Sequence, residues 1–213
     1  VGADQDHLEV KFRKGYYMPE TIDLGALTSS QGFKFHGEAA GDNTGYSVSS
    51  AGDINGDSID DLIVGARDND EGSGGAGAAY VIYGTSGTRG TLDLSALNTS
   101  QGFKILGENV LDYAGISVSS AGDVNGDGID DLIVGAHGND EGGNLSGAAY
   151  VIYGTTGIRG TLDLSALNTS QGFQILGEYV GDVAGYSVSS AGDINGDGID
   201  DLIMGALWNS GEG

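Results

Sequence analysis

The 213-residue sequence has no cysteine, one proline and few basic residues. Without cysteine there can be no disulfide, no thiolate metal site and no cysteine nucleophile. Eight Lys and Arg stand against 31 Asp and Glu, which gives a formal net charge of −23. A chain this acidic repels phosphate groups, so we expect neither nucleic acid nor an anionic membrane surface as a partner. No apolar run approaches the roughly 18 residues of a membrane span, so we expect no membrane insertion.

Glycine, in contrast, is abundant, and it marks an internal repeat. The 41 glycines fall at recurring positions rather than in low-complexity runs, which indicates tight turns between short strands. The segment TLDLSALNTSQGFKILGE at Thr91 returns at Thr161 with one change, Lys104 to Gln174, and a more divergent copy begins at Thr21. A fixed repeat, here of 70 residues, is typical of solenoids, propellers and arrays.

Each repeat contains four candidate strands. They are short, bounded by glycine and rich in β-branched or aromatic residues, as strands should be. In one repeat they read GYSVSSAGD from Gly45, DLIVGA from Asp61, GAAYVIYG from Gly77 and GFKILGE from Gly102. The runs LIV and YVIY do not alternate, so we expect those strands to be covered on both faces. The linker TLDLSAL is expected to hold a strand edge and one helical turn.

This pattern predicts an all-β fold made of four-stranded antiparallel β-propeller blades, in about three repeats of 70 residues. A β-helix or a sandwich is the weaker alternative. Calcium-binding β-rolls also use glycine and aspartate, but they repeat at nine residues, and nothing here recurs at that period. We expect one partial propeller over 1–213, with a trailing half-blade at 1–40, blades at 41–110 and 111–180, and a leading half-blade at 181–213.

An acidic motif, Asp-x-Asn-Gly-Asp-x-Ile-Asp-Asp, occurs once per repeat. Proteins bind calcium with oxygen-bearing side chains at positions 1, 3 and 5 of a tight turn. Position 12 carries Val64, Val134 or Met204, so the motif is not an EF-hand, and position 9 supplies the nearest carboxylate. We predict three calcium sites, each with four side chains and one isoleucine carbonyl as ligands: Asp53, Asn55, Asp57, Ile59 and Asp61; Asp123, Asn125, Asp127, Ile129 and Asp131; Asp193, Asn195, Asp197, Ile199 and Asp201.

The remaining polar residues do not suggest catalysis. Position 8 of the motif, held by Asp60, Asp130 and Asp200, is expected to point away and to act on the local field or on the turn. The histidines lie at non-equivalent repeat positions, and no Ser-His-Asp group recurs. The pairs Glu38/Asp42, Glu108/Asp112 and Glu178/Asp182 recur in every repeat, so we interpret them as turn devices and not as glycosidase carboxylates. We therefore expect a protein that is not an enzyme.

The segment Gly45–Arg67 resembles the FG-GAP repeat of integrin α-subunit propellers. The Phe-Gly that opens the family repeat is replaced by Thr44-Gly45, Ala114-Gly115 and Ala184-Gly185. Its closing Gly-Ala-Pro reads Gly65-Ala66-Arg67, Gly135-Ala136-His137 and Gly205-Ala206-Leu207. The resemblance implies a seven-bladed propeller with calcium between the first two strands of a blade, located outside the cell or on its surface. Near-identical repeats without cysteine look more like bacterial secreted relatives than an animal integrin.

These observations lead to a functional hypothesis with two alternatives. We expect an extracellular module for adhesion or for interaction with a protein or glycan, with structural calcium. The alternatives are a non-catalytic propeller attached to a secreted hydrolase or lyase, and a propeller lectin. The chain opens with Val1–Ala3, which looks like the end of a second strand, and Leu8–Lys14 and Gly32–Glu38 are expected to be third and fourth strands. Either the chain is a segment of a longer propeller, which we favour, or copies join as a homo-oligomer that completes the propeller.

Overall fold

The computed structural model describes residues 7–11, 23–71 and 74–208, and it contains two complete four-stranded sheets. The first consists of β3, β4, β5 and β7, and the second of β8, β9, β10 and β12, in which neighbouring strands are antiparallel. The bounds are β3 Thr44–Gly52, β4 Asp61–Ala66, β5 Ala78–Ile82, β7 Gly102–Leu106, β8 Ser117–Gly122, β9 Asp131–Ala136, β10 Ala148–Ile152 and β12 Gly172–Leu176. The four predicted strands per repeat and the all-β fold class are confirmed.

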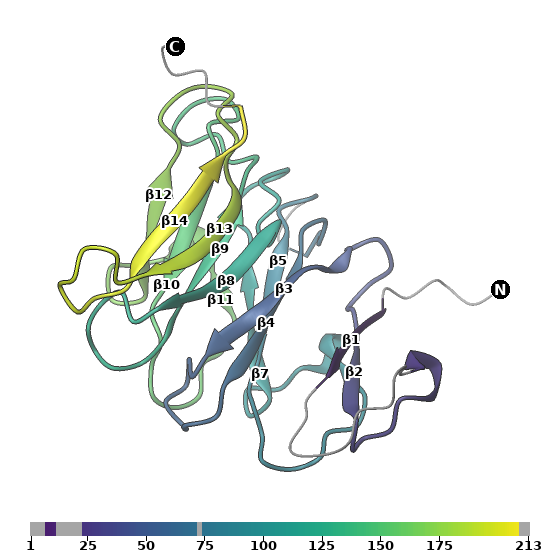
Figure 1. Cartoon of the computed structure of the whole chain (residues 1–213). Coiled ribbons are helices and arrows are strands. Elements are labelled where there is room, and N and C mark those ends of the chain that lie inside the picture. The colour runs from purple at the N-terminus through teal and green to yellow at the C-terminus, as the bar shows by residue number, and fades with distance from the viewer. Residues whose placement is uncertain (1–6, 12–22, 72–73, 209–213) are drawn as a thin grey trace.

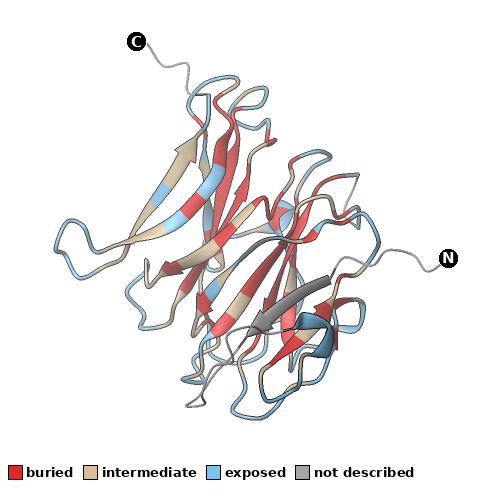
Figure 2. Ribbon diagram, turned by 45° about the vertical axis from the view of Figure 1, so that its right-hand side comes forward, coloured by how far each residue is buried: buried red, intermediate tan, exposed pale blue. Residues whose placement is uncertain are grey.

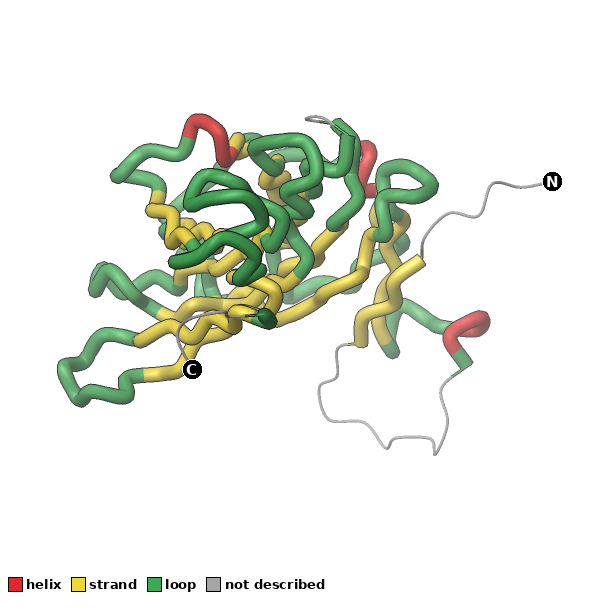
Figure 3. Tube along the Cα trace, turned by 90° about the horizontal axis from the view of Figure 1, so that it is seen from above, coloured by secondary structure: helices red, strands yellow, loops and turns green. Residues whose placement is uncertain are grey.

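A two-stranded piece lies on either side of the complete sheets. At one end, β1 (His7–Lys11) pairs with β2 (Gly32–His36), where third and fourth strands are expected. At the other end, β13 (Ala184–Gly192) pairs with β14 (Asp201–Ala206). Figures 1 and 3 show these two pairs at opposite ends of a row of sheets. The second strand expected to end at Val1–Ala3 lies outside the described residues.

The linker between the third and fourth strands joins each blade to the one before it. It holds a two-residue strand followed by a 3-10 turn, as predicted: β6 (Leu92–Asp93) with η2 (Leu94–Ala96), and β11 (Leu162–Asp163) with η3 (Leu164–Ala166). β6 pairs in parallel with β2, and β11 pairs in parallel with β7. The equivalent turn in the first repeat is η1 (Leu24–Ala26). The linker therefore adds one strand to the outer edge of the preceding sheet: β11 is the fifth strand beside β7, and β6 is the third beside β2.

The core lies between the sheets rather than inside any one of them. One face of the first complete sheet, with Ile63, Val81 and Ile105, packs in a single cluster with Leu132 and Tyr150 of the second. The opposite face of each complete sheet packs in a further cluster against the flanking pair. The predicted burial of the LIV and YVIY runs on both faces is confirmed, and Figure 2 shows these strands as mostly buried.

Glycine lets neighbouring sheets approach through their main chains. A Cβ on Gly65 would lie 2.0 Å from the carbonyl oxygen of Gly115, and one on Gly135 would lie 2.0 Å from that of Gly185. The same carbonyl of Gly115 accepts a hydrogen bond of 2.8 Å from the hydroxyl of Ser47. These glycines provide room between blades, in addition to the turns that composition predicts.

Gly147 offers a test of this packing. Its φ is +76°, and a Cβ there would lie 2.1 Å from the carbonyl oxygen of Ala184. Gly147→Ala should lower the free energy of unfolding by about 2 kcal/mol or more, because it combines a left-handed backbone with a clash against main chain. Gly160→Ala is the matched control, since nothing lies within 4 Å of its added Cβ, and it should change stability by no more than about 0.5 kcal/mol. Urea unfolding of both variants measures this, and equal effects would contradict the packing argument.

Candidate metal-binding loops

The three acidic motifs form the loops between the first two strands of successive blades. They join β3 to β4, β8 to β9 and β13 to β14. Their fourth residues, all glycine, have φ of +72°, +76° and +79°. The sixth residues are left-handed as well, at +69° for Ser58, +85° for Gly128 and +88° for Gly198. The three hairpins therefore share one backbone conformation, although the first has serine where the others have glycine.

The carboxylates at positions 1 and 5 fold back onto their own loop. In the first loop, Asp53 accepts hydrogen bonds from the N–H groups of Asp57 (2.9 Å) and Ser58 (2.8 Å). Asp57 accepts one from the N–H group of Ile59 at 2.9 Å. The other two loops repeat all three bonds, with distances between 2.8 and 3.1 Å. The amide oxygen at position 3 joins them by accepting the N–H group of residue 5 at 2.9 Å in every loop.

The carboxylate at position 9 is buried in the two complete blades. Asp61 accepts the N–H groups of Ile54 (3.2 Å) and Gly84 (2.6 Å), and it is 1% exposed. Burial raises the pKa of Asp61 to about 6, the N–H group of Gly84 lowers it in part, and the nearby carboxylates of Asp57 and Asp53 add to the increase. A buried carboxylate beside two others favours a bound cation. Asp131 has the same arrangement, with its pKa also raised to about 6 by burial.

The oxygen atoms in each loop are of the kinds that bind calcium, but in this structure the side chains do not enclose a common centre. Within the described residues, no three acidic or histidine side chains gather as a metal-holding group. Each loop nonetheless brings carboxylate and amide oxygens, the ligands that calcium prefers, within nine residues. In the first loop, each carboxylate oxygen of Asp53 accepts one loop N–H group and so keeps a second lone pair for a cation.

Position 8 has a role that the sequence did not predict. Asp130 and Asp200 do point away from their own loops, but each reaches the loop of the preceding blade. Asp130 accepts the N–H group of Asp53 at 2.8 Å, and Asp200 accepts that of Asp123 at 3.0 Å. The expected orientation away from their own loops agrees with these contacts, but the sequence did not predict the hydrogen bond to the preceding blade. The repeated Asp-Asp pair is visible in the sequence, whereas its partner 77 residues away is not.

The first loop is further held by the loop that follows β10. The N–H group of Thr155 donates to the carbonyl of Ile54 at 3.1 Å, and that of Gly157 donates to the carbonyl of Asn55 at 3.3 Å. Ile54 is only 3% exposed in this arrangement. The acidic loop of one blade is thus part of the contact with the next blade.

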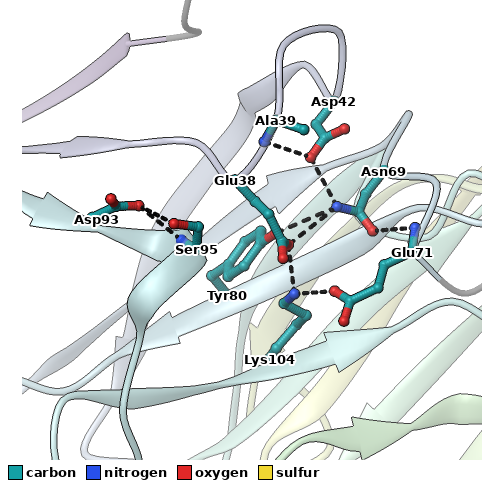
Figure 4. A network of polar contacts seen from close by, with 9 residues as sticks. All are labelled: Glu38, Ala39, Asp42, Asn69, Glu71, Tyr80, Asp93, Ser95 and Lys104. Carbon is teal, nitrogen blue, oxygen red and sulfur yellow. Dashed lines mark hydrogen bonds and ion pairs between the residues drawn. The ribbon is translucent and has the colours of Figure 1, made fainter.

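A second polar network lies at the other end of the first complete sheet (Figure 4). Asp42 accepts the N–H group of Ala39 at 3.2 Å and the amide of Asn69 at 2.9 Å, which agrees with its interpretation as a turn device. Glu38 has a different role, because it accepts the hydroxyl of the buried Tyr80 at 2.6 Å. It also pairs with Lys104. Glu38 therefore links the end of β2 to the interior of the next sheet.

The second complete blade has the same network with one substitution. Tyr150 donates to Glu108 at 2.6 Å, while Gln174, in place of Lys104, donates to the hydroxyl of Tyr150 at 3.0 Å. Burial raises the pKa of Glu108, and the nearby Glu141 and Asp112 carboxylates contribute to the increase. For Glu38, burial also acts to raise the pKa, but hydrogen bonds from Lys104 and Tyr80 outweigh it, so the pKa is lowered.

Exchanging lysine and glutamine at positions 104 and 174 should therefore change how the free energy of unfolding depends on pH. Gln174→Lys should raise the free energy of unfolding at pH 7 by about 0.5–1 kcal/mol, because it supplies Glu108 with a partly buried cation. A lowered carboxyl pKa stabilises the fold above the unfolded value of about 4.3, and this contribution is lost as the pH falls. The gain should therefore shrink towards pH 4. Lys104→Gln should show the opposite change. Urea unfolding at both pH values measures this, and a gain that does not depend on pH would contradict the assignment.

Four-stranded sheets in a row, each with the same acidic hairpin, define a repeat protein of the β-propeller class. The sequence model of the FG-GAP repeat family matches residues 44–82, 114–152 and 184–213, just over half of the chain. The first two matches run from the first strand of a blade to the end of its third. The chain belongs to the FG-GAP repeat family, which confirms the resemblance seen in the sequence.

Integrin α chains are among the relatives of this sequence. It is 34% identical to integrin alpha-PS5 of Drosophila melanogaster over 173 residues, which is 81% of this chain and 16% of that protein. It is 35% identical to integrin alpha pat-2 of Caenorhabditis briggsae over 50% of this chain and 8% of that protein. Against integrin alpha-2 of Mus musculus it is 32% identical over 65% of this chain and 11% of that protein. The chain thus spans less than a fifth of the relatives it matches.

Proposed function

We propose that each acidic loop binds one calcium ion with a structural role. The support is the recurrence of one donor set in one hairpin conformation, three times at equivalent places. When bound, calcium would supply positive charge to a loop that holds four carboxylates within nine residues. The chain's own residues would hold it: the side-chain oxygens of Asp53, Asn55 and Asp57, the carbonyl of Ile59, and the buried carboxylate of Asp61. The second and third loops would use Asp123, Asn125, Asp127, Ile129 and Asp131, and Asp193, Asn195, Asp197, Ile199 and Asp201.

A structural role follows from the position of these loops. The first loop carries Ile54 into the contact with the next blade, and Asp61 lies at its base with almost no exposure. Fixing the loop therefore fixes the surface that the neighbouring blade covers. All five proposed ligands of each ion come from the chain itself, which favours a structural ion over a catalytic one. Affinities of extracellular calcium modules are about 10⁻⁴–10⁻³ M.

The adjacent residues Asp60 and Asp61 make a matched test. Asp61→Ala should reduce the number of bound calcium ions by one, because it removes a proposed ligand. Asp60→Ala should leave the number unchanged, although it removes the same charge from the neighbouring position. Calorimetry or native mass spectrometry gives the stoichiometry, which we expect to be three for the wild type. At about 1 mM calcium, each site should add about 0.4–1.4 kcal/mol to the free energy of unfolding. Loss of an ion in both variants, or in neither, would contradict the ligand assignment.

We further infer that the protein is a binding module, not an enzyme, located outside the cell or on its surface. Support comes from its FG-GAP family membership and from its likeness to proteins named integrin α. No helix of the described residues is long and apolar enough to cross a membrane. The network around Glu38 is occupied in bonding Tyr80 and Lys104, so it serves packing. The ligand we propose is a protein or a glycan of the cell exterior.

Binding to immobilised extracellular proteins and to a glycan array tests this role. We expect saturable binding in calcium that weakens at least tenfold when a chelator is present, because the ordered loops belong to the blade surfaces. Calcium-dependent binding only on the glycan array would favour the propeller lectin. No binding to either surface, together with intact calcium stoichiometry, would contradict the adhesion role while leaving the metal assignment in place.

A further inference from the structure

The first proposed ligand of two acidic loops is held by a residue of the next blade. The N–H group of Asp53 donates to the carboxylate of Asp130 at 2.8 Å, and that of Asp123 donates to Asp200 at 3.0 Å. The second of these contacts has a further bond, because the N–H group of Asp200 donates to the carbonyl of Asp123 at 3.3 Å. We call Asp130 and Asp200 the linking aspartates. Each directly precedes the last proposed ligand of its own motif.

Glycine makes room for each linking aspartate. A Cβ on Gly52 would lie 2.2 Å from Oδ2 of Asp130, and a Cβ on Gly122 would lie 2.0 Å from Oδ2 of Asp200. These glycines directly precede the first proposed ligand of each loop, and their φ angles are +64° and +73°. The close approach of carboxylate and loop backbone therefore recurs at two blade junctions, with the same residue types and the same atoms.

Asp53 is consequently fixed on two sides. Its carboxylate oxygens accept the N–H groups of Asp57 and Ser58 within the loop, at 2.9 and 2.8 Å. Its own N–H group is directed to the linking aspartate, whose charge strengthens the hydrogen bond. Groups that orient metal ligands reduce the ordering that remains when the ion binds. Asp130 is therefore placed to act on the first site through Asp53, although it is not among the proposed ligands.

We propose that Asp130 and Asp200 are positioning residues for calcium, each acting on the loop of the preceding blade. This role rests on the calcium binding proposed above. Each linking aspartate holds the main chain of the first ligand, so the ion meets a loop that is already arranged to bind it. The calcium affinity of an acidic loop is then set in part by the blade that follows it. One Asp-Asp pair serves two ions, because Asp130 positions the first site and Asp131 is a ligand of the second.

Chains that retain one intact loop test this role, because their calcium titration reports a single dissociation constant. Asp127→Ala with Asp197→Ala leaves the first loop, and Asp57→Ala with Asp197→Ala leaves the second. In the first of these chains, Asp130→Ala should raise the dissociation constant at least about fivefold, since groups that orient metal ligands typically contribute about 10–100-fold. In the second, Asp200→Ala should have this effect, while Asp130→Ala should leave the constant unchanged.

Two further variants of the chain that keeps the first loop separate positioning from blade packing and from charge. Ser47→Ala removes another hydrogen bond between the same two blades, the 2.8 Å bond to the carbonyl of Gly115. It should lower the thermal midpoint measured in chelator and leave the calcium dissociation constant unchanged. Asp130→Asn keeps an oxygen that accepts the N–H group of Asp53, so it should retain most of the affinity that Asp130→Ala loses.

The outcomes distinguish this role from the calcium binding on which it rests. Equal losses of affinity in Ser47→Ala and Asp130→Ala would assign the effect to blade packing and overturn the proposal. An Asp130→Asn variant as weak as Asp130→Ala would assign it to charge and overturn the proposal as well. If the wild type binds three ions and Asp130→Ala does not weaken the first site, the positioning role alone is wrong. A wild type that binds no calcium would contradict both the positioning role and the proposed function.

Discussion

Main-chain contact between neighbouring sheets is the constraint on which the rest of the structure depends. Facing sheets ordinarily stand about 10 Å apart, separated by side chains. Here a Cβ on Gly65 or Gly135 would lie 2.0 Å from a carbonyl oxygen of the next blade, so the strands meet at these points without side chains between them. The many glycines therefore do more than form turns. A protein with this packing tolerates little variation at these glycine positions.

The same closeness connects the acidic loops with the blade contacts. Because the blades nearly touch, Asp130 can reach the backbone of Asp53, and Thr155 can reach Ile54. The proposed calcium ligands and the interblade contact are then formed by one short loop. An ion bound to such a loop would act on two blades, since ordering the loop also orders the surface that the next blade covers. This is a physical reason for placing one loop in each blade of a protein that lacks disulfides.

Much of the fold could be predicted because its signals are local. Short runs such as Leu62–Val64, bounded by glycine, indicate strands without any knowledge of their neighbours. The parallel pairing of β11 with β7 could not be predicted, because it joins residues of different repeats and depends on how the blades are placed. The candidate ligands were found for the same local reason, since they lie in one motif. The contact of Asp130 with Asp53 was missed because it depends on the register between blades.

Small sequence differences between repeats have physical effects whose size a sequence comparison does not show. Lys104 and Gln174 are the single difference in an 18-residue segment, yet the glutamate beside them has a lowered pKa in one blade and a raised pKa in the other. Conversely, Ile54 and Ile194 are identical residues at the same motif position, one buried and the other exposed. Residue type alone thus does not decide the physical state of a repeat position. In an array of nearly identical blades, contact with the neighbouring blade decides whether a given position is buried or exposed.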